Sequence, residues 1–173
     1  MTLLLTILRH LVSIAALPFM VTIVVPAWIA NRYDVPLAAP VSFAGIASAI
    51  LGAALLALGL VLFGASLYHF ATQGRGTLAP WDPPRSLVVR GPYRYVRNPM
   101  ISGVVFILLA EATLLQSPPH LVWALVFILI NLTYIPLIEE PQLADRFGED
   151  YAQYKRHVPR IVPRITPWDG TNT

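Results

Sequence analysis

Two clusters of ionisable side chains stand out in a chain that is otherwise mostly apolar. The segment "RGPYRYVRNPM" at residues 90–100 carries three arginines, among them Arg94 and Arg97, directly before a long apolar run. The second cluster is the adjacent carboxylate pair Glu139–Glu140 at the end of the next apolar run. Two carboxylates at a membrane boundary are costly unless they pair with cations or contact water. Together the clusters offer a cation and an anion, which would suit a zwitterionic amino acid as ligand.

The spacing around Pro118 and Pro119 places the two clusters at one depth. Asn98 lies 20 residues before Pro118, and Glu139 lies 20 residues after Pro119. Because a helix rises about 1.5 Å per residue, each arm is about 30 Å long, roughly the thickness of a bilayer core. Proline removes a backbone donor and disfavours helix in the residue before it, so the pair predicts a tight break. The sequence therefore predicts that Arg97 and Asn98 face the Glu139–Glu140 pair across the mouth of a helical hairpin.

Asn98 and Pro99 are typical of a helix start. Asparagine suits the N-cap, where its side chain accepts a bond from a free amide, and proline suits the first helical position. The free amides and the positive dipole end of such a helix attract a carboxylate or a phosphate. An alternative stays open for the arginines, since Arg94 and Arg97 could simply extend to lipid phosphates.

The composition indicates that membrane-spanning helices position these clusters. Of 173 residues, 56% are hydrophobic and 12% are charged, and this charged share is about half of that in soluble domains. The chain has no cysteine, which excludes disulfides, thiolate catalysis and cysteine-ligated metals. We expect an all-α integral membrane protein with about four transmembrane helices, a C-terminal helical hairpin and a cytoplasmic amphipathic helix. The apolar stretches are approximately residues 4–30, 41–71, 100–115 and 120–138.

The basic residues predict the orientation. Five of the 12 Lys and Arg residues lie between the second and third spans, and five follow the fourth span. By the positive-inside rule, the long loop and both termini face the cytoplasm, with residues 116–119 outside. We expect a single domain, 1–173, of four parts: two N-terminal spans (1–73), a cytoplasmic loop (74–98), the hairpin (99–138) and a cytoplasmic C-terminal segment (139–173).

The segment after the fourth span predicts an amphipathic helix. Its apolar residues recur at steps of four, four, three and four: Leu143, Phe147, Tyr151, Tyr154 and Val158. Two placements stay open, on the lipid interface or folded back over the hairpin mouth as a lid. Prolines at four-residue spacing then predict an extended, non-helical end.

Three further patterns carry predictions. Gly45, Gly52 and Gly59 repeat every seven residues and predict a close helix-packing face. Glu111, inside the third span, is either a functional carboxylate or a side chain that reaches water on the outer side. The four histidines lack the spacing of metal ligands, so we expect no metal site.

The run "SLVVRGPYRYVRNPM", followed after one hairpin by "EEPQLADRFGEDYAQYKRHVPRIVPR", resembles the isoprenylcysteine carboxyl methyltransferase and phospholipid methyltransferase superfamily. The resemblance covers about residues 76–164. Members are integral membrane enzymes that use S-adenosylmethionine, so it implies methyl transfer to a lipophilic or amphiphilic acceptor at the cytoplasmic membrane face. It assigns no catalytic base. It implies cofactor contacts at Leu87, Val88, Tyr93, Arg97, Asn98, Pro99, Met100, Ile101, Glu139 and Glu140, with Glu139 on the methionine ammonium group.

Three positions depart from the family pattern. Asn98 stands where many members have His, and Ile101 stands where they have Tyr. Asparagine cannot carry a charge or act as a general base. Eukaryotic carboxyl methyltransferases carry an arginine for the substrate carboxylate about one turn before the Glu pair, where this chain has Ile135. We therefore expect an acceptor other than a prenylcysteine carboxylate.

Two other functions are weighed against methyl transfer. One is a non-enzymatic membrane subunit or lipid-binding scaffold. The other is a nicotinamide-dependent, reductase-like protein, because sterol reductases have a similar C-terminal region. The expected partners are the lipid bilayer and a lipid or lipophilic acceptor, with no nucleic acid, and the sequence indicates no particular oligomeric state.

Overall fold

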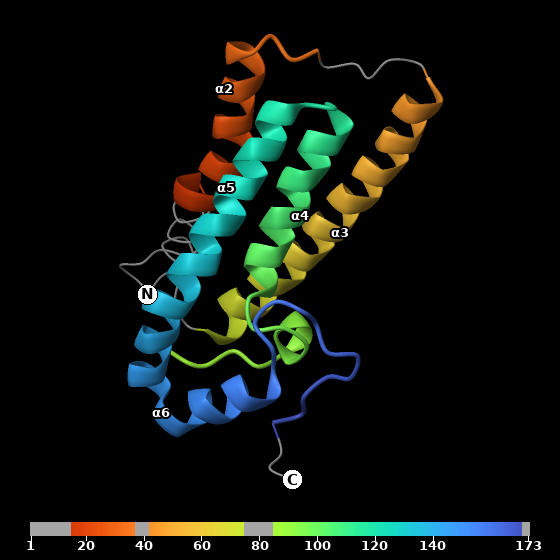
Figure 1. Ribbon diagram of the computed structural model, residues 1–173. Coiled ribbons are helices and arrows are strands. Elements are labelled where there is room, and N and C mark those ends of the chain that lie inside the picture. The colour runs from red at the N-terminus through yellow and green to blue at the C-terminus, as the bar shows by residue number, and fades with distance from the viewer. Residues whose placement is uncertain (1–14, 37–41, 75–84, 171–173) are drawn as a thin grey trace.

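The computed structural model describes residues 15–36, 42–74 and 85–170, and within these ranges every regular element is helical (Figure 1). This confirms the all-α prediction for the described part of the chain. The first half of the predicted first span and residues 75–84 of the predicted loop lie outside it. The elements are η1 (Ala15–Val24, a π-helix), α2 (Val25–Arg32), α3 (Phe43–Gln73), η2 (Gly91–Arg94, a 3₁₀ turn), α4 (Pro99–Leu114), α5 (Pro118–Tyr134), η3 (Ile135–Glu139, a π-helical turn) and α6 (Glu140–His157).

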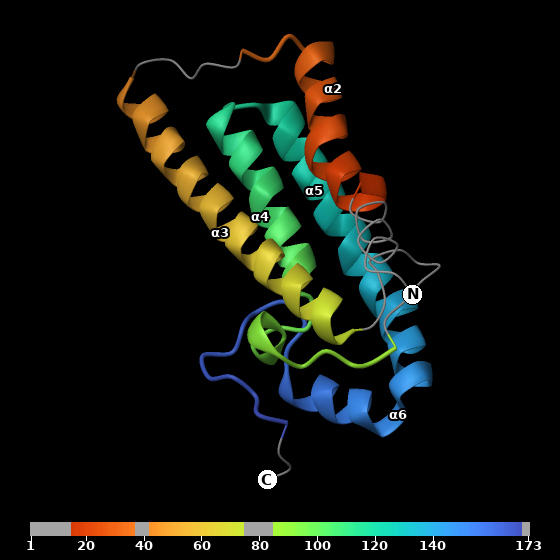
Figure 2. The same ribbon diagram turned by 180° about the vertical axis from the view of Figure 1, so that it is seen from behind.

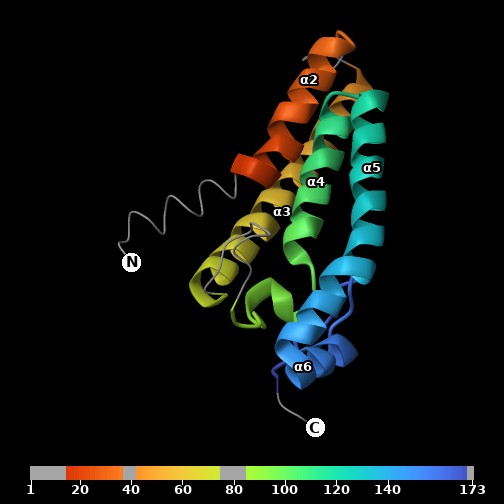
Figure 3. The same ribbon diagram turned by 90° about the vertical axis from the view of Figure 1, so that its left-hand side faces the viewer.

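The long helices form a bundle whose lower end is closed by α6, the loop before α4 and the C-terminal tail. α4 lies between α3 and α5, and α2 with η1 runs along α5, as the opposite views agree (Figure 2). In the side view, α5 continues at its lower end into the segment that forms α6 (Figure 3). Two helices are long and apolar enough to cross a membrane, Phe43–Gln73 and Pro118–His157, and two shorter apolar helices are Leu17–Arg32 and Pro99–Leu114.

The predicted hairpin is present as α4 and α5. α4 begins at Pro99, as predicted, and the break falls at residues 115–117, with Pro118 as the first residue of α5. One detail of the prediction was wrong, because the Asn98 side chain makes no capping bond at the start of α4. Its backbone carbonyl accepts the first helical bond, from Ser102 N at 3.1 Å, and its side-chain amide lines the cavity described below.

The seven-residue repeat of small side chains is a helix interface, as predicted. All three predicted glycines, Gly45, Gly52 and Gly59, are buried along α3, and Ser66 continues the repeat. α3 packs against α4. A Cβ atom on Gly59 would lie 2.9 Å from the carbonyl oxygen of Gly103 in α4, and one on Gly103 would lie 2.8 Å from Phe63 N. The two backbones are therefore in direct contact, which only glycine permits here.

Two side chains of α5 fix the N-terminal helices. Trp123 Nε1 donates to Val21 O at 3.1 Å. His120 Nε2 lies 3.2 Å from Pro26 O, and its Nδ1 lies 2.7 Å from Ser117 Oγ. Since a carbonyl can only accept, His120 donates through Nε2 and accepts through Nδ1. These bonds place η1 against the bundle.

The amphipathic helix is present and folds back beneath the hairpin. Gly148 has φ 53° and ψ −126°, which turns the second half of α6 across the end of the bundle (Figure 1). Tyr151, Tyr154 and Val158 are buried there against the segment before α4 and the tail. This is the folded-back arrangement, one of the two placements that the sequence left open.

The tail beyond α6 is non-helical, as predicted, and runs along residues 94–97. Arg97 N donates to Pro159 O at 2.9 Å, and Arg164 N donates to Tyr95 O at 2.9 Å. Arg94 Nε donates to Trp168 O at 2.9 Å. The tail thus holds the loop that precedes α4.

Candidate functional site

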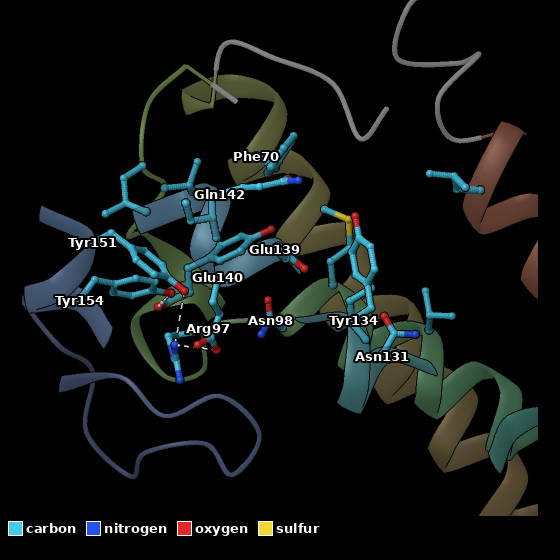
Figure 4. Close-up of a pocket in the computed structure, with 18 of the residues that line it drawn as sticks. Phe70, Arg97, Asn98, Asn131, Tyr134, Glu139, Glu140, Gln142, Tyr151 and Tyr154 are labelled. Atoms are coloured by element: carbon cyan, nitrogen blue, oxygen red, sulfur yellow. Dashed lines mark hydrogen bonds and ion pairs between the residues drawn. The ribbon is translucent and has the colours of Figure 1, made fainter. Parts of the chain in front are cut away.

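A cavity of about 590 Å³ lies where the bundle meets α6 and the segment 85–98 (Figure 4). Of the ten residues predicted as cofactor contacts, all but Pro99 line it. Pro99 is buried at the start of α4. The nine lining residues are Leu87, Val88, Tyr93, Arg97, Asn98, Met100, Ile101, Glu139 and Glu140. The structure thus brings together residues that lie up to 53 positions apart in the sequence.

The segment before α4 is positioned by one glycine. Gly91 has φ 54°, and a Cβ atom there would lie 2.3 Å from the His69 ring of α3. Only glycine fits this backbone conformation and this contact. The close approach seats the turn η2 on α3, and Tyr93 in that turn is buried at the cavity. His69 therefore acts in packing at this position.

Glu140 is the centre of a buried ion cluster. Its carboxylate lies 2.9 Å from Arg97 Nη1, 2.9 Å from Lys155 Nζ and 2.6 Å from Arg160 Nε. The side chain is only 3% exposed. Burial alone would raise the pKa of Glu140, but the hydrogen bonds from Arg160 and Lys155 and the charges of Arg97 and Arg160 outweigh it and lower the pKa to about 2. The three cations come from the segment before α4, from α6 and from the tail.

Glu139 has a different environment although it is the adjacent residue. It lines the cavity, and within the described residues no hydrogen bond or ion pair engages its carboxylate. Burial, and after it the charge of Glu140, raise the pKa of Glu139 above its ordinary value. The carboxylate is therefore one that a cationic ligand would stabilise in its charged form.

Three residues with polar donors line the same cavity as this carboxylate. Arg97 Nε is buried and has no hydrogen-bond partner among the described residues. The amide of Asn98 lines the cavity between Arg97 and Tyr134 in Figure 4. Burial, and after it the charge of Glu139, raise the pKa of Tyr93, so its phenol stays protonated as a donor. Donors and one free carboxylate thus face a common space.

The alternative that the arginines extend to lipid phosphates is not what the structure shows. Arg94 forms an ion pair with Asp169 and bonds Trp168 O. Arg97 is 9% exposed and engages Glu140. Both guanidinium groups are therefore committed to protein partners.

Sequence reasoning missed a second group of lining residues, which come from elements outside the motifs. They are Leu17, Pro18 and Val21 of η1, Phe63 and Phe70 of α3, and Phe127, Asn131 and Tyr134 of α5. One signal could have found part of the group. Asn131 is the only amide side chain in the apolar stretch 120–138, and a polar side chain within a membrane span commonly faces the protein interior.

Within the residues that the structure describes, no group of three or more His, Asp or Glu side chains could hold a metal ion. Glu111 lies in α4 and does not line the cavity.

Comparison with known proteins identifies the class. The model of the phospholipid methyltransferase family matches residues 47–150, which is more than half of the chain. The chain therefore belongs to the phospholipid methyltransferase family, within the membrane methyltransferase superfamily that its motifs resemble. Membership supports methyl transfer as the activity.

Two curated relatives have narrower names. The chain is 38% identical over 76 residues to methanethiol S-methyltransferase 2 of Bradyrhizobium diazoefficiens, a match covering 42% of this chain and 27% of that protein. It is 38% identical over 73 residues to the methanethiol S-methyltransferase of Crocosphaera subtropica, covering 42% and 28%. The matches span about a quarter of the length of these relatives. No solved structure matches the chain significantly.

Proposed function

We propose that the protein is an integral membrane methyltransferase that takes its methyl group from S-adenosylmethionine and acts on an uncharged lipophilic or amphiphilic acceptor at the cytoplasmic face. One observation carries the proposal. Nine of the ten predicted cofactor contacts line one cavity, and Glu139, whose carboxylate has no protein partner among the described residues, is one of them.

The residues present fit this cofactor. Glu139 would pair with the ammonium group of its methionine part, since a charge-assisted bond would satisfy the free carboxylate. The amide of Asn98, the first backbone amides of α4 and the unpartnered Arg97 Nε would bind its carboxylate. Leu87 and Val88 would supply an apolar wall for the adenine.

The bound cofactor would supply a methyl group on a sulfonium, which is transferred by in-line displacement. The protein then has two tasks, to align the acceptor with the methyl group and to exclude water. The apolar side chains of Phe63, Val104 and Phe127 at the cavity wall serve the second task. Within the described lining no histidine is present, and Glu139 and Glu140 are assigned to other partners, so we propose an acceptor that releases its proton without a dedicated base.

The acceptor proposal excludes a prenylcysteine carboxylate. Ile135 occupies the position of the expected arginine, is 5% exposed and lies outside the cavity lining. Residue 135 therefore offers no cation to an acceptor carboxylate, which would lose its hydration in the cavity without gaining an ion pair. Because the matched relatives are named methanethiol S-methyltransferases, a thiol is the acceptor that we propose first.

For the membrane arrangement we propose four spans, formed by η1 with α2, by α3, by α4 and by α5, with both termini cytoplasmic. The long apolar helices α3 and α5 support two of these spans, and α4 and Leu17–Arg32 are the two shorter apolar helices. The basic segment before α4 and the basic tail meet at one end of the bundle, as the positive-inside rule requires.

Calorimetry with S-adenosylhomocysteine on the purified, detergent-solubilised protein tests the proposal. We expect saturable binding of one ligand per chain and, with labelled S-adenosylmethionine, transfer of label to a thiol or lipid extract. A non-enzymatic scaffold would bind no S-adenosylhomocysteine, and a reductase-like protein would bind a reduced nicotinamide dinucleotide instead. A folded protein that binds no S-adenosylhomocysteine would refute the proposal.

A further inference from the structure

One face of α5 brings polar groups into the apolar end of the cavity. Phe127, Asn131 and Tyr134 line the cavity at steps of four and three residues, so they lie on one side of the helix. In Figure 4, Asn131 and Tyr134 lie on the opposite side of Asn98 from Arg97. The face is thus separate from the ion cluster.

This face lies deeper in the bundle than the free carboxylate. Asn131 precedes Glu139 by eight residues in a continuous helical run, which corresponds to about 12 Å along the axis. A ligand group held at Glu139 and a second group held at Asn131 would therefore occupy different ends of one cavity.

Asn131 presents a hydrogen-bond acceptor in this deeper part. Its Nδ2 donates to Phe127 O at 2.8 Å. Only the amino group of a carboxamide can donate to a carbonyl, so the amide oxygen is the atom left over. Among the described residues no donor contacts this oxygen, and none bonds the Tyr134 hydroxyl. An amide inside an apolar span is costly unless its polar atoms find partners, and a ligand would supply the missing one.

The surroundings of these groups favour an uncharged ligand. Leu17, Val21 and Phe63 complete the wall at this end. Of the two arginines in the cavity lining, Arg97 pairs with Glu140 and Arg146 belongs to α6, at the other end. A carboxylate or an ammonium group would lose its hydration here without gaining an ion pair.

We propose that Asn131 and Tyr134 form the acceptor subsite and that it takes an uncharged thiol on an apolar body, whose S–H donates to Asn131 Oδ1. The inference rests on the proposed function. A thiol, with an ordinary pKa of about 8.5, enters uncharged at neutral pH, whereas an alkylamine, with a pKa of about 10, must first lose a proton. During transfer the new bond joins the thiol sulfur to the methyl carbon, the bond from that carbon to the sulfonium breaks, and the thiol proton leaves to water.

A binding experiment tests the subsite without turnover. Because the chain has no cysteine, the single-cysteine variant Phe127→Cys in lipid nanodiscs reports labelling by N-ethylmaleimide at that position alone, and it keeps both Asn131 and Tyr134 in the cavity. The probes are 1-decanol, an unreactive neutral analogue of the thiol, and decanoate and decylammonium as charged analogues. At about ten times its Kd, 1-decanol should slow labelling about 10-fold, and the charged analogues should have little effect.

Thr133→Cys is the matched control, because Thr133 is exposed on the same helix and does not line the cavity. Its labelling should not respond to any of the three compounds. Equal protection of position 127 by decanoate, or no protection by 1-decanol, would overturn the proposal. The assay is run with and without S-adenosylhomocysteine, so a failure of cofactor binding refutes the proposed function while the decanol result still decides the subsite.

A kinetic experiment shows whether Asn131 binds the acceptor or only supports the fold. In Asn131→Leu, kcat/KM for alkanethiols should fall about 5- to 20-fold, the worth of one buried hydrogen bond. The affinity for S-adenosylhomocysteine should stay unchanged, and Thr133→Val should change neither quantity. Loss of S-adenosylhomocysteine binding in Asn131→Leu, or an unchanged kcat/KM, would contradict an acceptor role.

Discussion

The adjacent residues Glu139 and Glu140 should respond to the same substitution in opposite ways. Glu140→Gln removes the charge that three cations share, and it leaves Arg97, at 9% exposure, as a buried cation without its counter-ion. Glu139→Gln removes a carboxylate that has no partner among the described residues. One substitution should therefore reduce stability, and the other should reduce ligand affinity.

The magnitude for Glu140 follows from its environment. A pKa lowered from 4.5 to about 2 corresponds to about 3 kcal/mol, since one pH unit is worth about 1.4 kcal/mol. Breaking a buried ion pair costs a similar amount, about 3–5 kcal/mol. In a chain of this size about 3 kcal/mol lowers Tm by about 6–12 °C. The ligand affinity of Glu140→Gln is then measured below its reduced Tm.

The magnitude for Glu139 follows from the bond that its proposed ligand would make. A charge-assisted hydrogen bond is worth about 1.5–3 kcal/mol, so Glu139→Gln should weaken S-adenosylhomocysteine binding about 10- to 100-fold. Its Tm should stay the same or rise, because a neutral amide is easier to bury than an unpaired carboxylate.

The assay is thermal unfolding in detergent together with calorimetry on the same preparations. Glu149→Gln is the matched control, since Glu149 is exposed and, among the described residues, makes only a 3.8 Å ion pair with Arg156. This substitution should change neither Tm nor affinity. The reasoning is refuted if Glu139→Gln lowers Tm as much as Glu140→Gln does, or if Glu139→Gln binds S-adenosylhomocysteine as tightly as the wild type.

Three further predictions concern pH, packing and topology. S-adenosylhomocysteine affinity, measured by calorimetry, should rise with pH as Glu139 ionises above its ordinary range and fall again at alkaline pH as the ligand amino group loses its proton. Glu139→Gln should lack the rise on the acidic side. Gly59→Ala should lower Tm, because its Cβ would lie 2.9 Å from Gly103 O, whereas Gly64→Ala in the same helix, with nothing within 4 Å, should not. A single cysteine at position 85 should resist impermeant maleimide in intact cells and react in inverted vesicles; labelling from outside would contradict the cytoplasmic loop.

Wild-type stability should also depend on acid through Glu140. Its pKa is lower in the folded protein than in the unfolded chain, so its contribution is complete above about pH 4.5 and is lost as the pH falls toward about 2. Tm measured over this range should fall in the wild type and stay flatter in Glu140→Gln. Parallel curves would mean that other carboxylates dominate acid unfolding.

Features with a local or periodic signature could be predicted from the sequence. The hairpin follows from the distances of Asn98 and Glu139 to the Pro118 break, and helix geometry is the same in every protein. The α3–α4 interface follows from the glycines spaced by seven, because only small side chains allow such close backbones. Nine of the ten predicted cofactor contacts line one cavity, and those at the start of α4 and at the end of η3 meet there because these two patterns determine where the helix ends lie.

Other features depend on contacts between distant segments and could not be predicted. The different roles of Glu139 and Glu140 depend on Lys155 and Arg160, which reach Glu140 only because Gly148 turns α6 back beneath the bundle. For Asn131 the sequence signal, an amide within an apolar stretch, does not by itself indicate a site, since such an amide can bond its own backbone, as it also does here.

The arginines of the opening motif therefore serve two purposes with the same charges. On the cytoplasmic side they would orient the chain in the membrane, and in the folded protein they are neutralised locally, Arg97 by Glu140 and Arg94 by Asp169. Of the two carboxylates that line the cavity in the described residues, this leaves Glu139 alone without a counter-ion. A ligand that brings a single positive charge to that point completes the charge balance of the site, and one that brings a negative charge there worsens it. The ion cluster thus favours a cationic ligand group, because Glu140 is already paired with cations of the protein and Glu139 is not.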